Sequence, residues 1–435
     1  MTTVFQAPQS ATFANMELSA VTRGRTVPIE RLDDVLEGGL PWVPTNVCIS
    51  SVNTIPPDNP FGPMGETKII PLPHTRMILP ERADRPAMAL YLSEIAHHDG
   101  AFWPACARSQ LRQALSDLNT QYGLTLKAGF EHECYIDNLQ DTPTAAYSLA
   151  GARKVSGLAH EVQAIMATAG TRLDQFVAEF GVNQFEISSP VREGLGAADH
   201  AVLAREAVRD AARGREAHAT FAPKPHLGEA GSGVHIHLSL WDSNGVPQTA
   251  HAGSLTATSG AFAAGILNHL AAVMAFSTPT PNSFQRIHES SWVGVFSCFG
   301  VRNREAALRL APRTPLADGS HPGASMEFRL CDGSANPYLA LAALVRAGMI
   351  GLNKALPAPV SIEQDPATLS AEARAAHHIE RVPYGVEGCL QAAAPLAEDW
   401  FGPLFWQAYE AVRRNDMSDA ARLADAYPSM LSKII

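Results

Sequence analysis

The sequence predicts a mixed α+β protein in which a small β-rich domain precedes a larger domain of strands and helices. The 435 residues are 46% hydrophobic and 17% charged, which is typical of a chain that buries a large core. Residues 26 to about 103 are rich in proline and glycine and contain short β-like runs. The residues that follow alternate strand-like and helix-like runs, a pattern that predicts packed layers of sheet and helix.

The N-terminal part of the chain divides into two expected regions. The hydrophobic residues of segment 1–25 show no clear helical or strand periodicity, and we expect a flexible tail there. Residues 26–103 are expected to form the β-rich domain, with strands such as Thr67–Pro71 and Ala87–Leu92. The run IPPDNPFGPMG at 55–65 predicts a long loop within it, because proline and glycine interrupt regular structure.

The larger domain is expected to span residues 104–435 and to begin with a helix at Arg108–Tyr122. Strands are predicted at Leu124–Ile136, Asn183–Ser188, Val234–Leu240, Val293–Phe299, Ala307–Leu310 and Met326–Leu330. Helices are predicted at Leu158–Ala169, Ala197–Ala212, Ala261–Phe276, Tyr338–Leu352 and within Leu369–Leu431. Asn336 and Pro337 are a favourable start for the helix that follows them, since asparagine caps and proline suits the first turn.

Charge and composition argue against several classes of protein. The net charge is −10, from 33 basic and 43 acidic residues, whereas a general nucleic-acid binder is usually basic. No apolar run is long enough to span a bilayer, and the first residues lack the pattern of a secretory signal. The six cysteines are scattered without a CxxC pair, which favours reduced thiols in the cytoplasm. We therefore expect a cytoplasmic protein with neither a nucleic-acid nor a membrane partner.

Arginines are concentrated in the segment 282–309, NSFQRIHESSWVGVFSCFGVRNREAALR. Arg286, Arg302, Arg304 and Arg309 lie there among aromatic and small residues. Each guanidinium presents a planar fork of donors that suits carboxylate or phosphate. A merely basic surface is the alternative, but the segment is largely apolar. The arginines therefore predict a site that binds anions.

Carboxylates and histidines recur at strand spacing elsewhere in the chain. Alternation places Glu131 and Glu133 on one strand face and His132 on the other. The same rule pairs His235 with His237 in GSGVHIHLSL, and Glu327 with Arg329 in MEFRL. A polar strand edge, packed histidines and a structural ion pair are the respective alternatives.

Glu179 and Glu186 bracket FGVNQF, where a turn at Gly181 would bring both acids into one pocket; alone, a solvated Glu179 would be expected. Together the acids and histidines could hold hard divalent cations, Mg²⁺ or Mn²⁺, with the arginines opposite. That is the arrangement that phosphoryl transfer from a nucleotide requires. The chain has no GxxxxGK[ST] loop and no protein-kinase signature, so a different ATP site is needed.

The order of these motifs resembles the glutamine synthetase family. The matching segments are FEHECYI, AEFGVNQFEIS, GSGVHIHLSLW, NSFQRI, VRNREAALR and MEFRLCDGSANPYLALAAL, between about residues 104 and 355. The segments ATFAPKP and SSWVGVFSCFG are similar in sequence to those of a divergent branch of the family, which includes fungal and plant synthetase-like domains. Enzymes that glutamylate amines other than ammonia lie in the same superfamily.

The resemblance implies a fold, a ligand set and a reaction. The fold would be an N-terminal β-grasp domain followed by a catalytic α/β domain, in stacked rings, usually dodecamers, with sites between subunits. Two or three Mg²⁺ or Mn²⁺ ions would be held per site. Glutamate would attack the γ-phosphate of ATP to give γ-glutamyl phosphate, which an amine then converts to an amide, in a closed site that excludes water.

The family motifs also assign roles to individual residues. One metal would bind Glu133, Glu179 and Glu186, and the other Glu131, His235 and Glu327. Glutamate would be bound by Arg286 and Arg329, with Gly231, Gly233, Glu133 and His235 beside it. The nucleotide phosphates would be bound by Arg304, Arg309 and His237. Arg286, Arg304, Arg329 and Trp292 would be the catalytic set.

The sequence departs from the family where ammonia would bind. Glutamine synthetases keep a glutamate six residues after the arginine that matches Arg286, in a loop like PGYEAP, and here that position is Trp292. An indole offers a hydrophobic wall and a cation–π face but accepts no proton from ammonium. The family's ammonium-binding aspartate has only Asp58 as a weak counterpart, and the asparagine before GSG is Ala230. The tyrosine loop used for adenylylation is not visible near residues 363–383.

These departures favour an ATP-dependent glutamate–amine ligase that uses another acceptor. The metal, nucleotide and glutamate residues are all present, whereas the ammonium residues are changed. The apolar surroundings of Trp292 favour a small alkyl or aromatic monoamine. The alternatives are an ordinary glutamine synthetase, a γ-glutamylpolyamine synthetase and a catalytically silent scaffold or sensor. The sequence leaves open which amine is used and which residue deprotonates it.

Overall fold

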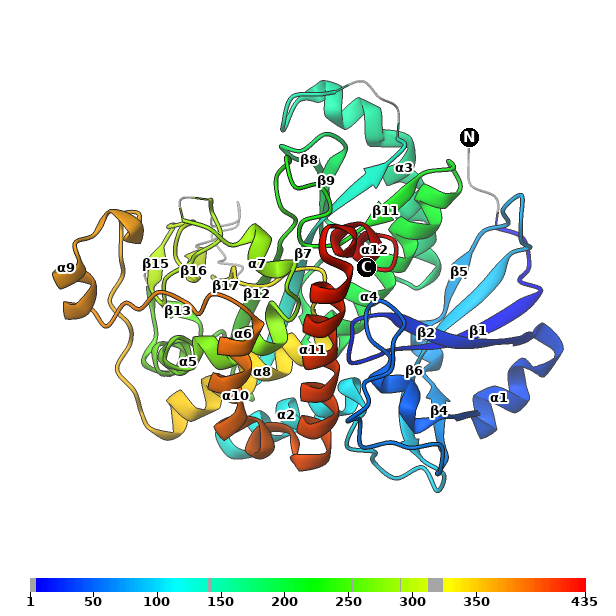
Figure 1. Cartoon of the computed structure of the whole chain (residues 1–435), viewed down its shortest axis with the longest axis horizontal. Helices are drawn as coiled ribbons and strands as arrows, with labels where there is room; N and C mark the ends of the chain where they lie inside the picture. The colour runs from blue at the N-terminus through cyan, green and yellow to red at the C-terminus, as the bar shows by residue number, and fades with distance from the viewer. Residues whose placement is uncertain (1–4, 140–142, 252, 290, 312–323) are drawn as a thin grey trace.

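The computed structural model describes residues 5–139, 143–251, 253–289, 291–311 and 324–435. A strand-rich N-terminal domain (blue in Figure 1) lies at the opposite end of the molecule from helix α9. Its sheet has the order β2 (Thr22–Pro28), β1 (Ser10–Met16), β6 (Met88–His97), β4 (Thr67–Pro71) and β3 (Leu40–Trp42), and β5 (Met77–Leu79) also pairs with β6. Strands β1 and β6 run parallel at its centre, and helix α1 (Leu32–Gly38) follows β2. The expected β-grasp domain is confirmed.

The prediction of a flexible tail at residues 1–25 is wrong for the part that the structure describes. Strand β1 lies inside the sheet, with Ala11 and Phe13 fully buried, and Phe13 stacks on Tyr91 with ring centroids 5.3 Å apart. Strand β2 is a polar edge strand, TRGRTVP, so its composition hid its pairing with β1. Residues 1–4 lie outside the described residues.

The larger domain contains a nine-stranded sheet. Its order is β15 (Phe299–Val301), β16 (Leu308–Ala311), β17 (Ser325–Phe328), β12 (Val234–Trp241), β7 (Thr125–Asp137), β9 (Gln184–Ser188) and β8 (Gln175–Ala178). Strands β10 (Arg192–Glu193) and β11 (His218–Thr220) also pair with β7, and β13 (Ala250–His251) pairs with β14 (Ser254–Leu255). The long strand β7 therefore pairs with β9, β10, β11 and β12.

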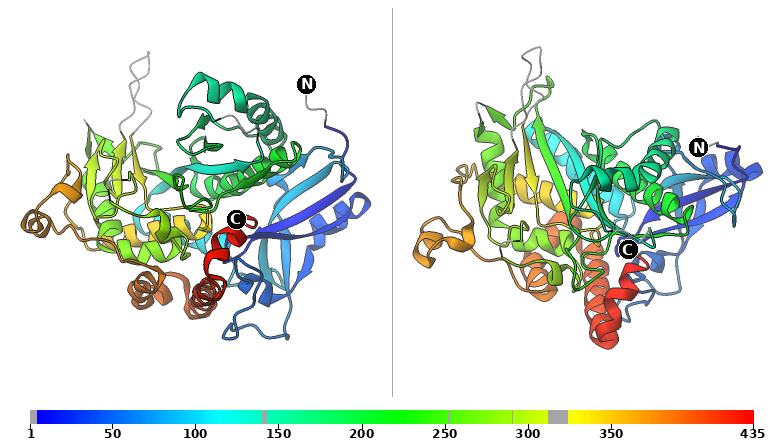
Figure 2. Two further views of the ribbon diagram at one scale, coloured as in Figure 1. Left: turned by 45° about the horizontal axis from the view of Figure 1, so that its top comes forward. Right: turned by 90° about the horizontal axis from the view of Figure 1, so that it is seen from above.

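The larger domain also contains helices, several of which pack against this sheet or against one another (Figures 1 and 2). They are α2 (Ala107–Tyr122), α3 (Leu149–Thr168), α4 (Gly194–Arg213), α5 (Ala257–Asn268), α6 (Leu270–Ser277), α7 (Ser283–Arg286), α8 (Pro337–Asn353), α9 (Ala371–Ala376), α10 (Val386–Phe401), α11 (Pro403–Leu423) and α12 (Tyr427–Ser432). Asn336 caps α8 as predicted, because its side chain accepts from the backbone of Tyr338 and Leu339. Its amide also donates to the carbonyls of Met16 and Glu17, at 3.2 and 2.9 Å, which joins the two domains.

Two predicted elements differ from the structure. The strand predicted at Val293–Phe299 is irregular until Phe299, because Trp292 and Gly294 take left-handed backbone angles, with φ of 60° and 79°. The helix predicted at Ala261–Phe276 is two helices, α5 and α6, that meet at 75° around His269. Among the described residues no single helix is long and apolar enough to cross a membrane, although this bent pair meets the criteria of length and composition.

Candidate functional site

Strand register brings the predicted carboxylates and histidines onto one face of the sheet. On β7, Glu131 lies opposite His235 of β12, and Glu133 lies opposite Glu186 of β9. On β17, Glu327 lies between His237 and Arg309 of the neighbouring strands. Because alternate side chains of a strand share a face, residues distant in sequence meet over this sheet.

These side chains line a cavity of about 650 Å³. The predicted residues among its lining are Glu131, Glu133, Glu179, Glu186, Gly231, His235, Arg286, Trp292, Arg304, Arg309, Glu327 and Arg329. His237 and Gly233 lie beside them: the Nε2 atom of His237 is 3.2 Å from Glu131 Oε1, and the backbone nitrogen of Gly233 donates to Glu133 Oε2 at 2.8 Å. The structure thus brings all the residues that the family motifs assign to one place, whereas Arg302, the fourth arginine of the segment 282–309, lines a separate outer cavity.

The hairpin of β8 and β9 brings Glu179 to Glu186. The backbone nitrogen of Gln184 donates to the Gly181 carbonyl at 3.1 Å, and that of Glu179 donates to the Gln184 carbonyl at 2.9 Å. Glycine is needed at 181, because an added Cβ would lie 2.0 Å from the Tyr135 hydroxyl. The turn predicted at Gly181 is confirmed, and it places both acids at the cavity.

The crowding of acids disfavours negative charge at two of them. Burial and the carboxylates of Glu131, Glu133 and Glu179 raise the pKa of Glu186 to about 8. Burial and the charge of Glu133 raise the pKa of Glu179 to about 7, although the Tyr147 hydroxyl donates to both of its oxygens. Such a group of oxygen donors suits hard divalent cations, whose charge would offset the repulsion.

The other half of the cavity mixes carboxylates with histidines. The His235 Nδ1 atom is 3.5 Å from Glu131 and 3.7 Å from Glu327. Ligand atoms of Glu131, His237 and Glu327, and likewise of Glu131, Glu186 and His235, all lie within 4.8 Å of one another. Burial tends to raise the pKa of Glu131, but hydrogen bonds and charges of the two histidines hold it well below its usual value. The donor set therefore fits Mg²⁺ or Mn²⁺.

Three arginines face these acids from the far side of the cavity. Arg309 and Arg329 both pair with Glu327, which is fully buried, and the charges of His235, Arg329 and His237 hold its pKa down against burial. Arg286 is buried and donates to the Cys331 carbonyl at 3.1 Å. Its side chain passes so close to Gly231 that a Cβ there would lie 2.3 Å from Arg286 Cγ. Basic and acidic groups thus line one cavity, and they meet at Glu327.

An aromatic wall, which we define as Tyr147, Phe180 and Trp292, closes one side of the cavity. The rings of Trp292 and Phe180 meet edge to face with centroids 5.9 Å apart, and those of Phe180 and Tyr147 do so at 5.7 Å. All three side chains are more than half exposed, at 52%, 61% and 59% for Trp292, Phe180 and Tyr147. The sequence had indicated Trp292 alone, since nothing local links the other rings to it.

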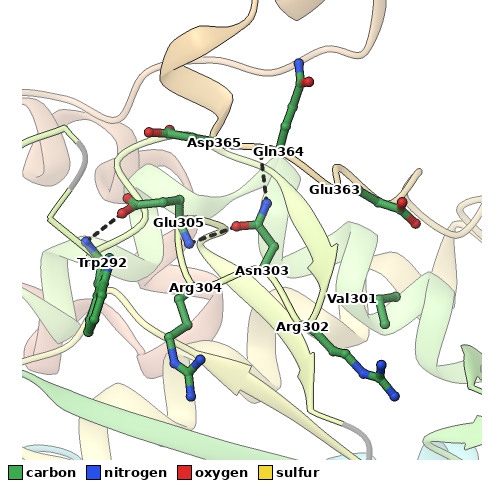
Figure 3. A pocket seen from close by; sticks show the side chains of 9 residues that line it. All are labelled: Trp292, Val301, Arg302, Asn303, Arg304, Glu305, Glu363, Gln364 and Asp365. Carbon is green, nitrogen blue, oxygen red and sulfur yellow. Dashed lines mark hydrogen bonds between the residues drawn. The ribbon is translucent and has the colours of Figure 1, made fainter.

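Trp292 also lines a second, outer cavity of about 650 Å³, which it shares with Arg304 (Figure 3). Glu305, Glu363 and Asp365 lie on this outer side. Figure 3 shows Glu305 pointing at the backbone nitrogen of Trp292, which donates to its Oε1 at 2.9 Å. Sequence reasoning missed Glu305, because its contact is with a main-chain atom thirteen positions away.

The two substituted ammonium positions lie in different places. Asp58 is exposed in the N-terminal domain and is not among the residues that line either cavity of its own chain. Ala230 lines the inner cavity, and its carbonyl accepts from the Tyr135 hydroxyl at 2.8 Å. Neither residue supplies the cavity with the acid that Trp292 replaces.

Comparison with known proteins agrees with this arrangement. Residues 104–428 match the glutamine synthetase catalytic domain, and residues 5–103 match the glutamine synthetase N-terminal domain. The γ-glutamylpolyamine synthetase GlnA3 of Streptomyces coelicolor is 30% identical over 97% of this chain and 92% of its own length.

Solved structures are similar along the whole chain. A crystal structure of a novel glutamine synthase homolog is 30% identical, with a TM-score of 0.87 over 98% of both chains. The GmaS/ADP complex shares the fold, with a TM-score of 0.80 and 22% identity over 95% of this chain and 94% of its own. With both domains matched in order and the motif residues gathered at one cavity, the chain belongs to the glutamine synthetase family.

Proposed function

We propose that this protein is an ATP-dependent ligase that joins the γ-carboxylate of glutamate to an amine other than ammonia. The family uses ATP and divalent metals to activate glutamate, and its members differ in the nitrogen donor. The observation that carries the proposal is the contrast within one cavity. The acids and arginines of phosphoryl transfer are complete, whereas an aromatic wall replaces the acid expected for ammonium.

Each half of the cavity would serve one part of the reaction. Glu131, Glu133, Glu179, Glu186, His235 and Glu327 would hold the cations, which neutralise phosphate charge when they are bound. Arg286 would hold the carboxylate of glutamate, and Arg329, with Arg304 and Arg309, would stabilise charge on the transferring phosphate. His237 would lie near the nucleotide phosphates. The γ-glutamyl phosphate formed in this way would then face the aromatic wall.

The aromatic wall supports an acceptor with a hydrocarbon part. Exposed edges of Trp292 and Phe180 would cover an alkyl or aryl group and exclude water from the acyl phosphate. Ammonia has no such group, so the wall would contribute nothing to its binding. We therefore propose a small alkyl or aromatic monoamine as acceptor.

A polyamine acceptor is the second candidate, and a specific observation favours it. Glu305, Glu363 and Asp365 line the outer cavity beyond Trp292, where the distal ammonium of a long amine would be placed. The relative from Streptomyces coelicolor is named for a polyamine substrate. For this candidate, Glu363→Gln would raise the KM for a diamine and leave that for a monoamine unchanged.

The decisive experiment supplies ATP, Mg²⁺ or Mn²⁺, glutamate and one amine at a time. ADP release and the mass of the product are measured with ammonia, short alkylamines, arylalkylamines and diamines. We expect a γ-glutamylamide to form with a larger amine at a higher kcat/KM than with ammonia. A protein most efficient with ammonia would be an ordinary glutamine synthetase, and one that releases no ADP with any acceptor would be a scaffold or sensor.

We further propose that the chain forms homo-oligomeric rings, in keeping with its family. Dodecamers with sites between subunits are the expected assembly, and the mass in solution tests it. Sedimentation at the mass of a single chain, 46.5 kDa, in the presence of metal and nucleotide would contradict this expectation.

A further inference from the structure

The backbone of Trp292 is held in an unfavourable conformation by two hydrogen bonds. Its φ of 60° lies in the left-handed region, where a bulky residue carries about 1–3 kcal/mol of strain. Its nitrogen donates to Glu305 Oε1 at 2.9 Å, and its carbonyl accepts from Arg329 Nη2 at 2.8 Å. Such a conformation persists only where its surroundings determine it. Glu305 and Arg329 therefore hold the peptide groups on both sides of the residue that carries the indole.

We propose that Glu305 is the positioning residue of the acceptor site, and that it acts by fixing Trp292 rather than by binding the amine. The proposal rests on the proposed function, because it assigns the acceptor to the aromatic wall. Removing the Glu305 carboxylate would free one side of the strained peptide. The indole would then leave the place where it meets Phe180 and faces the cavity.

Glu305 is itself firmly placed. Its backbone nitrogen donates to Asn303 Oδ1 at 3.0 Å. The Asn303 amide in turn donates to the carbonyl of Gln364 at 3.0 Å (Figure 3) and to that of Ile362 at 2.8 Å. This series of bonds ties the backbone of Glu305 to a separate segment of the chain, so that its carboxylate starts from a fixed point of the main chain.

The aromatic wall connects Trp292 to the opposite side of the cavity. Trp292 contacts Phe180, Phe180 contacts Tyr147, and the Tyr147 hydroxyl donates to Glu179 at 2.9 Å. Glu305 thus stabilises one end of a wall whose other end is bonded to an acid of the cation site. The shape of the acceptor site is determined from both ends.

The test separates positioning from charge by using two substitutions at one position. Glu305→Ala removes both the acceptor oxygen and the charge, whereas Glu305→Gln keeps an oxygen that can accept from the Trp292 nitrogen. We expect Glu305→Ala to raise the KM for the best amine about tenfold, the loss of about one hydrogen bond, with little change in KM for ATP and glutamate. Glu305→Gln should restore the KM for the amine to within about twofold of the wild type.

Glu289→Gln is the matched control, because it removes a charge from a nearby carboxylate that pairs with Arg381 at the surface. Its kinetics should equal those of the wild type. An unchanged KM for the amine in Glu305→Ala would overturn the proposal. Equal impairment of Glu305→Gln and Glu305→Ala would also overturn it, since a direct ionic contact with the amine would then be at work.

Trp292 fluorescence gives a readout that does not require turnover. The emission of Trp292 is the difference between each protein and its Trp292→Phe counterpart. We expect this emission to shift to longer wavelength in Glu305→Ala and to stay unchanged in Glu305→Gln. Identical emission in all variants would refute the positioning, whereas a wild type that forms no γ-glutamylamide would refute the proposed function alone.

Discussion

At the scale of single residues, the cavity is a balance between acids that repel one another and bases that restrain them. Burial, together with the other carboxylates that crowd them, raises the pKa values of Glu179 and Glu186. Glu131 and Glu327 have histidine or arginine partners, and their pKa values are lowered. A cation would therefore gain most on the Glu179 and Glu186 side, where, among the described residues, no basic group lowers their pKa values.

Glu327→Ala should lower ADP formation by roughly 100-fold or more. The change removes a proposed cation ligand and leaves Arg309 and Arg329 without their buried partner. ADP release with saturating glutamate and amine measures the effect, and Glu289→Ala serves as a surface control. Nearly normal ADP formation would contradict the metal assignment.

Trp292→Glu should change the preference among amines and leave nucleotide affinity nearly unchanged. The substitution replaces the exposed indole of the aromatic wall with the kind of acid that favours ammonium. We expect kcat/KM for ammonia to rise relative to that for an alkylamine, by about tenfold or more. An unaltered ratio would mean that Trp292 does not contact the acceptor.

At the scale of elements, strands carry most of the proposed cation ligands, whereas shorter connections carry Phe180 and Trp292 of the aromatic wall. Strands β7, β9, β12 and β17 hold Glu131, Glu133, Glu186, His235 and Glu327 in register. The tight turn after β8 carries Phe180, and the irregular segment before β15 carries Trp292.

Gly181→Ala should impair both cation binding and amine specificity, because it displaces the hairpin that carries Glu179 and Phe180. A Cβ at 181 would overlap Tyr135, a cost of about 1–3 kcal/mol in stability. Cation affinity from calorimetry and Tm from thermal unfolding measure the two effects. Gly196→Ala in α4, where an added Cβ meets open space, is the control. Equal cation affinity and equal Tm in Gly181→Ala and Gly196→Ala would argue against a role for the turn in positioning Glu179.

Alternating strands and capped helices could be predicted from the sequence, because their signals are local. The alternation of side-chain types in AGFEHECYI and VHIHLSL predicted the ends of β7 and β12 to within a residue or two. Asn336 marked the start of α8. The edge strand β2 escaped prediction, since its polar residues are paired but not buried. The Val293–Phe299 strand was predicted wrongly, because the left-handed angles of Trp292 and Gly294 depend on contacts with distant residues.

Only the residues of the candidate site that belong to sequence motifs could be predicted. All the proposed cation ligands and arginines had a sequence signal and line the inner cavity. Tyr147, Phe180 and Glu305 had none, because their roles depend on ring contacts and a main-chain hydrogen bond between separate segments.

At the scale of the whole molecule, the contribution of Glu186 to stability without cations should fall as the pH rises. The pKa of Glu186 is 4.5 without burial or neighbours and about 8 in the fold, so the folded state binds more protons between these values. The free energy of unfolding contributed by this group therefore decreases from about pH 4.5 to pH 8. Added Mn²⁺ should reverse the decrease at pH 8, by about 2.7 kcal/mol at one hundred times its Kd.

Thermal unfolding with a chelator and with Mn²⁺ across this pH range measures the effect. Glu186→Gln should be less sensitive to pH than the wild type, because the amide does not titrate. Equal pH sensitivity of the wild type and Glu186→Gln in the chelator, or a wild-type Tm that does not respond to Mn²⁺ at pH 8, would contradict the assignment.

The division between strands and connections has a consequence for how this enzyme family diversifies. A one-residue slip of β7 would exchange Glu131 and Glu133 for buried His132, so the strands tolerate little change without losing the chemistry altogether. The wall that would select the acceptor lies on segments that can vary one substitution at a time. If the proposed roles hold, new nitrogen donors would be acquired by gradual mutation around an unchanged set of cation ligands and arginines, and libraries for engineering new amide products should be confined to Tyr147, Phe180, Trp292 and Glu305.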